Sequence, residues 1–333
     1  MKQVAQRMVG RFKRTRTDGV FKSGRAKVPL GVLARSALKG AMSDGMLQLR
    51  RRPRKVYGQI GGLEVRLAET RTDIKRAQRL RYQVFYEEMA ASPSLSAMMR
   101  RRDEDPYDAI CDHLLVVDTT KAGSPINPWP GAQNPKVVGT YRLLRQEMAE
   151  RGPGFYTQGE YDLAPLIARQ PTGTRFLELG RSCVLGSYRS KRSVELLWHG
   201  LWTYVRENKI DVMIGCASFE GTDPAAHAMA LSFLHHQAMA PPLWRCSAQP
   251  QLYQRMDFLA KDQLDFKAAL RGMPPLIKGY LRLGALFGDG CVIDRQFGTT
   301  DVFVVMPVAQ INPRYFGHFG APEELKSRVA LDA

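Results

Sequence analysis

Apolar residues along this chain follow strand-like and helix-like spacings from residue 63 onward. Leu63, Val65 and Leu67 alternate with polar or small residues, which is typical of a half-buried strand. Compact, β-rich apolar runs predict five more strands, at 113–118, 136–145, 176–184, 210–217 and 300–306. Helical spacing predicts helices over about 72–89 and 194–205, one that begins at the Asp223-Pro224 cap, and a late one over 277–287. The order of these elements predicts a mixed α/β sheet with flanking helices.

The segment 176–205 joins a predicted strand, a basic loop and a predicted helix. Arg189, Lys191 and Arg192 place three cations at the beginning of this helix. A helix N-terminus has free backbone N–H groups and a partial positive charge, so it attracts anions. The pattern therefore fits a phosphate-bearing ligand, and it fits equally well a solvated basic loop that binds nothing.

Composition places the chain among globular proteins. Its 333 residues are 44% apolar, and no run approaches the ~18–20 charge-free apolar residues of a membrane-spanning helix. No signal peptide opens the chain, so we expect a cytoplasmic protein. The five cysteines are odd in number and include no CxxC pair, which predicts reduced thiols and neither a disulfide frame nor a zinc site.

Positive charge is concentrated at the N-terminus. Residues 1–60 contain 16 Lys and Arg against only Asp18 and Asp44, a net charge of +14 out of the total of +17. The segment lacks strong periodicity, so we expect a largely disordered basic arm. Such an arm suits an anionic membrane surface, nucleic acid or an acidic protein, or it only adds solubility.

Four short motifs place charged residues in the predicted sheet and beside it. They are Arg81 with Phe85 at i, i+4, the segment Asp105-Pro-Tyr-Asp108, Arg142 in GTYRLL, and Glu178 with Arg181 in ELGRSCV. With the YRSKRS loop, they resemble the GNAT acyltransferase fold, and more closely its acyl-carrier-protein-dependent branch, which includes the acyl-homoserine-lactone synthases. Together with LRYQVFYEEM and PPLIKGYLRLGA, they are similar to the L-ornithine N-alpha-acyltransferases of bacterial ornithine lipid synthesis. The resemblance covers about residues 60–310.

This resemblance implies an activity and a domain organisation. The enzyme would move a 3-hydroxyacyl chain from acyl carrier protein to the alpha-amine of L-ornithine and give lyso-ornithine lipid. The expected domain is a GNAT-like, mostly antiparallel sheet over 61–310, with a C-terminal extension from about 241 and a tail at 311–333. We expect no bound cofactor and no metal, and we expect the arm to associate with the anionic inner membrane and not with nucleic acid.

Two alternatives come from different function classes. One is a signal synthase that uses another amine acceptor, such as S-adenosylmethionine. The other is a non-catalytic protein that binds membranes or nucleic acid through the basic arm. The signal synthases carry a tryptophan shortly after the position of Phe85, whereas this chain has Glu87, Glu88 and Met89 there, which weakens the first alternative.

The basic loop departs from the usual GNAT pattern for coenzyme A. That pattern has small residues that let backbone amides approach a pyrophosphate, but here Arg192 and Val194 stand at two of these positions. The departure favours a donor with a single phosphate on a pantetheine arm, as acyl carrier protein presents. We therefore expect Arg189, Lys191, Arg192 and Ser193 to bind the phosphopantetheine.

An amine that attacks a thioester must lose a proton, and Glu178 is our expected base. The resemblance places the acceptor between Arg81, Phe85, Asp105, Asp108, Arg142 and Arg181. Arginines suit the carboxylate of an amino acid, and acids suit its amines. The alternative is that these charges form a structural ion-pair network. A nucleophilic pair of Cys183 and His113 is a further alternative that no spacing supports.

In a regular strand Glu178 and Arg181 would point to opposite faces of the sheet. Glycine inside a strand often marks a bulge, which shifts the facing by one residue. Gly180 lies between the two charges, so we predict a bulge within 179–181 that turns both side chains into one cleft. On this basis Glu178→Gln should reduce turnover far more than stability.

Overall fold

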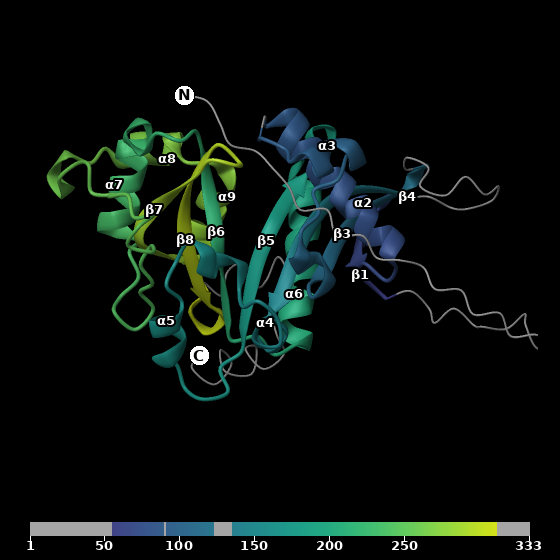
Figure 1. Cartoon of the computed structure of the whole chain (residues 1–333), viewed down its shortest axis with the longest axis horizontal. Helices are drawn as coiled ribbons and strands as arrows, with labels where there is room; N and C mark the ends of the chain where they lie inside the picture. Colours follow the sequence, from purple (N-terminus) through teal and green to yellow (C-terminus); the bar gives the residue numbers. More distant parts are fainter. Residues whose placement is uncertain (1–54, 90, 123–134, 312–333) are drawn as a thin grey trace, which may run out of the picture. The chain divides into compact units, whose positions relative to one another are not determined.

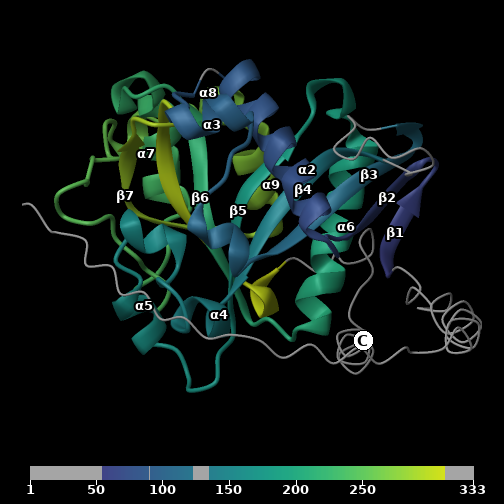
Figure 2. The same cartoon turned by 45° about the vertical axis from the view of Figure 1, so that its right-hand side comes forward.

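The computed structural model describes residues 55–89, 91–122 and 135–311, and these contain one sheet of eight strands (Figure 2). The spatial order is β1-β2-β3-β4-β5-β6-β8-β7. Every neighbouring pair is antiparallel except β5 and β6, which are parallel. The predicted mixed, mostly antiparallel α/β fold is thus confirmed. The strands are β1 (Val56–Ile60), β2 (Leu63–Leu67), β3 (Asp112–Ala122), β4 (Pro135–Arg145), β5 (Phe176–Val184), β6 (Val212–Glu220), β7 (Leu286–Asp294) and β8 (Thr299–Pro307).

Strand β1 corrects the predicted extent of the basic arm. Residues 56–60 were assigned to a disordered arm, but they pair with β2, and Tyr57 packs against the main core cluster. The strand forms because its backbone satisfies its hydrogen bonds against β2, although most of its side chains are polar or exposed. Residues 1–54 of the predicted arm and residues 312–333 of the predicted tail lie outside the described residues.

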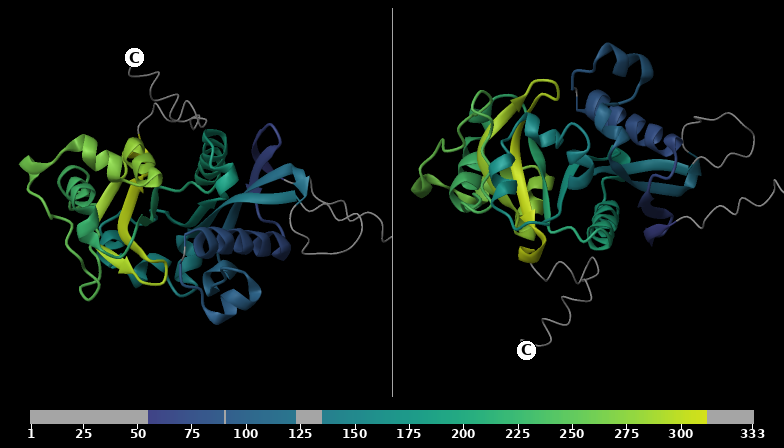
Figure 3. Two further views of the ribbon diagram at one scale, coloured as in Figure 1. Left: turned by 90° about the horizontal axis from the view of Figure 1, so that it is seen from above. Right: turned by 60° about the horizontal axis from the view of Figure 1, so that its bottom comes forward.

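Two helices cover opposite faces of the sheet over the strands β3 and β4 (Figure 3). Helix α2 (Arg71–Tyr82) begins after Thr70, whose side chain accepts the backbone N–H of Asp73, so the helix starts one residue before the predicted residue 72. It continues as a π-helix, η2 (Gln83–Glu88). Helix α6 (Lys191–Glu207) buries Leu197, Leu201 and Val205 on the other face.

The remaining helices are shorter and lie mostly at the ends of the sheet. They are α3 (Leu95–Arg100), η3 (Pro106–Ala109), α4 (Gln146–Glu150), η4 (Tyr156–Gly159), α5 (Ala164–Ala168), η5 (Gly186–Tyr188), η6 (Pro224–His227), α7 (Ala228–Gln237), η7 (Lys261–Gln263), α8 (Phe266–Gly272), α9 (Pro275–Leu283) and η8 (Val308–Gln310). Within the described part of the chain, no helix is long and apolar enough to cross a membrane.

The C-terminal region completes the sheet. The late helix was predicted over 277–287, but α9 ends at Leu283 because Gly284 adopts a left-handed conformation with a φ of 89°, which favours glycine. Residues 286 and 287 instead begin β7, a strand that the sequence analysis missed. The predicted late strand is confirmed as β8, which pairs with both β6 and β7.

Strands β5 and β6 diverge in the middle of the sheet (Figure 1). Their pairing is confined to Phe176–Val212, Leu177–Met213 and Glu178–Ile214. At the point of divergence, a Cβ on Gly215 would lie 2.4 Å from the carbonyl oxygen of Leu179, so the close approach of the two strands requires glycine. The sheet is therefore open beyond Glu178.

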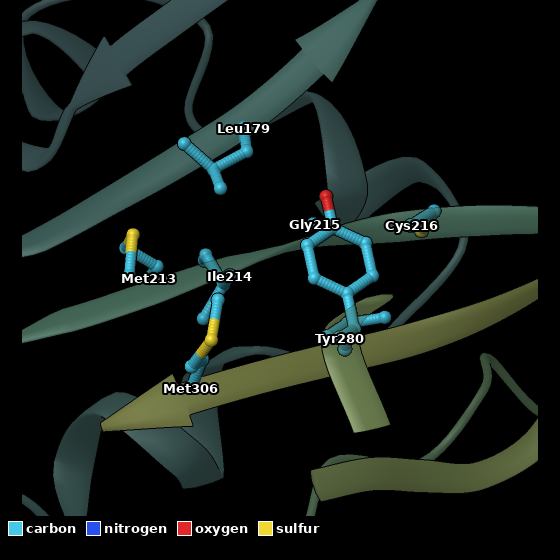
Figure 4. Close-up of a pocket in the computed structure, with 8 residues that line it drawn as sticks. Leu179, Met213, Ile214, Gly215, Cys216, Tyr280 and Met306 are labelled. Carbon is cyan, nitrogen blue, oxygen red and sulfur yellow. The ribbon is translucent and has the colours of Figure 1, made fainter. Parts of the chain in front are cut away.

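A small pocket of about 10 Å³ lies at this opening on the α9 side (Figure 4). The hydroxyl of Tyr280, from α9, lies 3.1 Å from that of Tyr141 on β4. Tyr280 thus connects the two halves of the sheet across the opening. The lining is otherwise apolar and includes Leu179, Met213 and Met306.

Candidate active site

Strand β5 contains the predicted irregularity. Arg142 pairs with Gly180 and Thr140 pairs with Cys183, so two residues of β5, Arg181 and Ser182, lie opposite the single residue between them on β4. A bulge is thus confirmed, and it includes Arg181. The left-handed backbone belongs to Arg181, with a φ of 52°, and not to Gly180. This conformation is costly for a residue with a side chain and is found mainly where the surroundings impose it.

The bulge brings Glu178 and Arg181 to the same side of the sheet. Glu178 accepts the backbone N–H of Tyr156, and the guanidinium of Arg181 lies 5.0 Å from the centre of the Tyr156 ring. Both side chains therefore contact Tyr156 and lie on one side of the sheet, as predicted. Leu179 packs on the opposite face, in the core cluster that contains α6.

Arg81 is fully buried and binds two aspartates. Its Nη1 and Nη2 donate to the two carboxylate oxygens of Asp108 at 2.9 and 2.8 Å, and its Nε lies 2.8 Å from Asp103. Burial alone would lower the pKa of Arg81, but the two carboxylates raise it. Because these partners occupy the guanidinium, Arg81 holds α2 to the acidic loop and has little capacity left for a ligand.

Arg142 and Arg181 meet at Asp105. Arg142 Nη1 lies 2.6 Å from Asp105 and 3.3 Å from Asp108, and Arg181 Nη2 lies 3.3 Å from Asp105. The structure thus brings Arg81, Asp105, Asp108, Arg142 and Arg181 into one connected network. Arg81 holds the pKa of Asp108 well below its usual range, against the effect of burial. Asp108 therefore stays charged at neutral pH.

Asp103 is a member of this network that the sequence analysis did not select. It lies 3.3 Å from Nε of Arg181 and accepts the hydroxyl of Tyr86 at 3.1 Å. Sequence offers one signal, because Asp103 stands in the same acidic run as Asp105. Its role follows only from the bulge, which turns Arg181 toward it.

An aromatic group surrounds the arginines. The guanidinium of Arg142 lies over the rings of Tyr107 and Tyr156, at 5.6 and 5.5 Å, and that of Arg181 lies 4.6 Å from Phe297. The ring of the predicted Phe85 lies edge-on to that of Phe297, with 5.7 Å between the ring centres. Tyr156 and Phe297 were missed because they lie far in sequence from the four motifs. Tyr107 lies inside the Asp105-Pro-Tyr-Asp108 motif, but the sequence analysis did not select it.

Glu178 is buried with both carboxylate oxygens engaged. Oε1 accepts the backbone N–H of Thr157 at 2.7 Å, and Oε2 accepts that of Tyr156 at 2.9 Å. Burial raises the pKa of Glu178, although these hydrogen bonds oppose the shift. A carboxylate with a raised pKa is better suited to accept a proton near neutral pH. The same contacts anchor η4, so Glu178 also has a structural role.

Three further carboxylates lie together beside Tyr156. Oxygens of Glu160, Asp294 and Asp301 lie within 4.8 Å of one another. Burial and the nearby Asp301 raise the pKa of Glu160 to about 7, and burial raises the pKa of Asp301 to about 6. The sequence analysis missed this cluster because its members come from η4 and from the two strands of a late hairpin.

The predicted donor loop forms the start of α6. Ser190 caps the helix by accepting the backbone N–H of Ser193, and the Ser193 side chain is buried against this cap. Arg189 pairs with Glu88, and the exposed Lys191 lies 3.6 Å from Glu195. Arg192 is exposed and forms no ion pair with the described residues. Arg189, Lys191 and Arg192 are thus all exposed, and Arg189 is held in an ion pair with Glu88.

The alternative nucleophilic pair receives no support from the geometry. Cys183 is buried, and burial raises the pKa of its thiol to about 12, so the thiol is protonated at neutral pH. His113 Nε2 lies 3.1 Å from the carbonyl oxygen of Asp108, and burial lowers the pKa of His113. All five cysteines are free thiols, as predicted.

Comparison with known proteins gives both a domain family and relatives. Residues 80–199 match the family described as acetyltransferase (GNAT) domain, which confirms the predicted GNAT-like fold. The L-ornithine N(alpha)-acyltransferase of Brucella abortus (strain 2308) is 53% identical over 80% of this chain and 92% of its own length. The enzyme of the same name from Agrobacterium fabrum (strain C58) is 52% identical over 81% and 89%.

A solved structure matches at much lower identity. The N-acyl amino acid synthase FeeM, from uncultured soil microbes, is 10% identical over 76% of this chain and 98% of its own, with a TM-score of 0.42.

Proposed function

This chain belongs to the L-ornithine N(alpha)-acyltransferase family and is an N-acyltransferase, and from this premise we propose that it acylates the alpha-amine of L-ornithine. The donor is a 3-hydroxyacyl chain on acyl carrier protein, and the product is lyso-ornithine lipid. The observation that carries the proposal is the opening between β5 and β6, which has Glu178 at its edge and Arg181 turned toward the same side.

The reaction places a neutral amine next to a thioester carbonyl. Glu178 accepts the proton that the attacking amine loses, directly or through water, because its raised pKa and buried position favour the protonated form. Arg142 and Arg181 stand beside it, both over the ring of Tyr156, and attract the acceptor's carboxylate. Arg81, which is occupied by aspartates, holds this arrangement in place.

The donor's phosphopantetheine binds at the N-terminus of α6. Exposed Lys191 and Arg192 provide charge for its single phosphate, and the helix N-terminus adds its own partial positive charge. Nothing in this account requires coenzyme A.

Lipid extraction from cells that express the chain tests this function. With ornithine added to the medium, the account predicts an ornithine-containing monoacyl lipid that is absent from cells expressing Glu178→Gln. A product that contains another amine in place of ornithine, at equal expression, contradicts the proposed acceptor.

We further propose that the protein is cytoplasmic and binds the inner membrane peripherally through its basic N-terminus. The net charge of +14 over residues 1–60 predicts strong, salt-sensitive attraction, at roughly 1 kcal/mol per basic residue near the surface. Because β1 begins at Val56, the deletion that tests this should end at residue 54 and not at 60. Sedimentation with anionic vesicles that is unaffected by salt or by this deletion contradicts the proposal.

A further inference from the structure

The charges of the network around Arg181 are matched internally. Asp103, Asp105 and Asp108 pair with arginines, and Glu178 accepts two backbone N–H groups. An amino acid with two amines needs acidic groups that are not already committed to arginine. This network therefore has few free acidic groups for the second amine of the acceptor. That the acceptor has a second amine rests on the function proposed above.

Three acidic residues without an ion pair among the described residues lie next to this network. Glu160, Asp294 and Asp301 have no Lys or Arg within ion-pair distance in the described residues, although their oxygens lie within 4.8 Å of one another. Asp294 Oδ1 accepts two backbone N–H groups of its turn, from Gln296 and Phe297. Glu160 accepts the thiol of Cys216 at 3.2 Å.

One oxygen of the cluster is buried without a partner. Asp301 is 7% exposed, and its Oδ1 has no hydrogen-bond partner among the described residues. The hydroxyls of Thr299 and Ser218 lower the pKa of this carboxyl group, but burial raises it more. A buried carboxylate oxygen that lacks a donor is costly, so its presence in an acidic cluster indicates a cation that is supplied from outside the chain.

Two short segments connect the acidic cluster to Glu178 and Arg181. Helix η4 carries Thr157, which donates to Glu178, and ends next to Glu160. Phe297, whose N–H is bound by Asp294, lies 4.6 Å from the guanidinium of Arg181. The cluster therefore borders both the proposed base and the arginines that attract the carboxylate.

We propose that Glu160, Asp294 and Asp301 bind the side-chain ammonium of the acceptor amino acid and thereby direct acylation to the alpha-amine. An amine must be neutral to attack a thioester, whereas adjacent carboxylates stabilise its protonated form. The amine held in the cluster is thus kept charged and unreactive. The other amine is left facing Glu178 and the sheet opening.

The test compares L-ornithine with L-norvaline, which has the same carbon chain without the second amine. Purified wild type, Glu160→Gln and Asp301→Asn are assayed with both acceptors for KM and kcat, and with ornithine for the position of the acyl group. Asp289→Asn on β7 is the control, because this acid contacts Tyr253 and Ser247 outside the cluster.

We expect both cluster variants to raise the KM for ornithine about tenfold or more, as the loss of a charged hydrogen bond does, and to leave the KM for norvaline unchanged. Without a donor, ornithine should raise the Tm of the wild type and not that of the variants, and norvaline should raise neither. Asp301→Asn removes a buried like charge, so we expect it to fold, and its Tm is measured alongside.

Three outcomes overturn the inference. Equal losses with ornithine and norvaline would assign the cluster to catalysis or folding. Activity that is lost with a chelator and restored by Mg²⁺ or Ca²⁺ would assign it to a metal. A wild type that acylates neither amino acid would overturn the proposed function itself, and this inference with it.

Discussion

Oδ2 of Asp103 lies 3.3 Å from Nε of Arg181, across the bulge that turns Arg181 away from the α6 side of the sheet. The same oxygen lies 2.8 Å from Nε of Arg81. One aspartate therefore connects α2 with the central strand. Because Arg181 holds a strained, left-handed backbone, this contact is part of what keeps its side chain in the site.

Replacement of Asp103 by Asn should strongly destabilise the protein. It leaves two buried arginines with one carboxylate fewer, and breaking a buried ion pair costs about 3–5 kcal/mol. Urea unfolding measures this free energy. The neighbouring Glu104→Gln is the control, because Glu104 is exposed and its ion pairs should contribute about 0–1 kcal/mol. Similar losses in the two variants would show that Asp103 has no special role.

Replacement of Glu178 by Gln should reduce both stability and turnover. The sequence alone predicted a loss of turnover with little loss of stability, but the structure shows both oxygens bound to N–H groups of η4. An amide keeps only one acceptor oxygen, so we expect a loss of about 1–3 kcal/mol in the free energy of unfolding. If Glu178 is the base, kcat should also fall by roughly 10²–10⁴.

Gln158→Ala separates these two effects. Gln158 Oε1 accepts the backbone N–H of Phe155 at 2.8 Å, so this variant disturbs the same turn and leaves the carboxylate of Glu178 in place. We expect lower stability and a kcat close to that of the wild type below the Tm. If Gln158→Ala and Glu178→Gln lower kcat equally, the role of Glu178 is to hold the turn.

The acidic cluster should make stability depend on pH. The pKa of Glu160 is raised from 4.5 to about 7, and that of Asp301 from 3.8 to about 6, so the folded state binds protons that the unfolded state has released. The stabilisation by these protons is complete below about pH 4 and is lost as pH rises to about 7. Glu160→Gln stays neutral, so its stability relative to wild type should increase by about 1–3 kcal/mol between pH 5 and 8. Parallel stability curves would contradict the raised pKa values.

Charge reversal in the donor loop should weaken donor binding. Arg192→Glu places a negative charge next to the proposed phosphate site at the N-terminus of α6, so the KM for acyl carrier protein should rise about tenfold or more with little change in kcat. Lys267→Glu changes the same charge on an exposed position of α8 and is the control. The difference between the two variants should shrink at high salt. An unchanged KM for Arg192→Glu would remove this loop from the donor site.

Much of this fold is predictable from local pattern. The strands β3 to β6 and the helices α2 and α6 appear in the sequence as apolar runs and stripes. The end of α9 was wrong because Gly284 and the pairing of Leu286 with Val305 outweigh the helical spacing. Strand β1 was missed because it is only five residues long, directly follows a basic segment and depends on pairing with β2.

The residues of the candidate site were predictable where several of them lie within one short sequence motif. Glycine pointed to the bulge at β5, although the strained residue is Arg181 itself. Asp103, Tyr156 and the cluster of Glu160, Asp294 and Asp301 come from segments far apart in the sequence. No local spacing predicts such contacts. Those of Asp103 and Tyr156 depend on β5 and its bulge, and the acidic cluster forms when the hairpin of β7 and β8 joins the sheet.

The most direct test of the central claim is an assay of the purified full-length protein with L-ornithine and a 3-hydroxyacyl chain carried either by acyl carrier protein or by coenzyme A. Mass spectrometry identifies the product and the acylated nitrogen. The account predicts the alpha-amide of ornithine, formed with a kcat/KM for the carrier protein donor at least tenfold above that for coenzyme A. Acylation of the side-chain amine, or equal efficiency with the two donors, would contradict it.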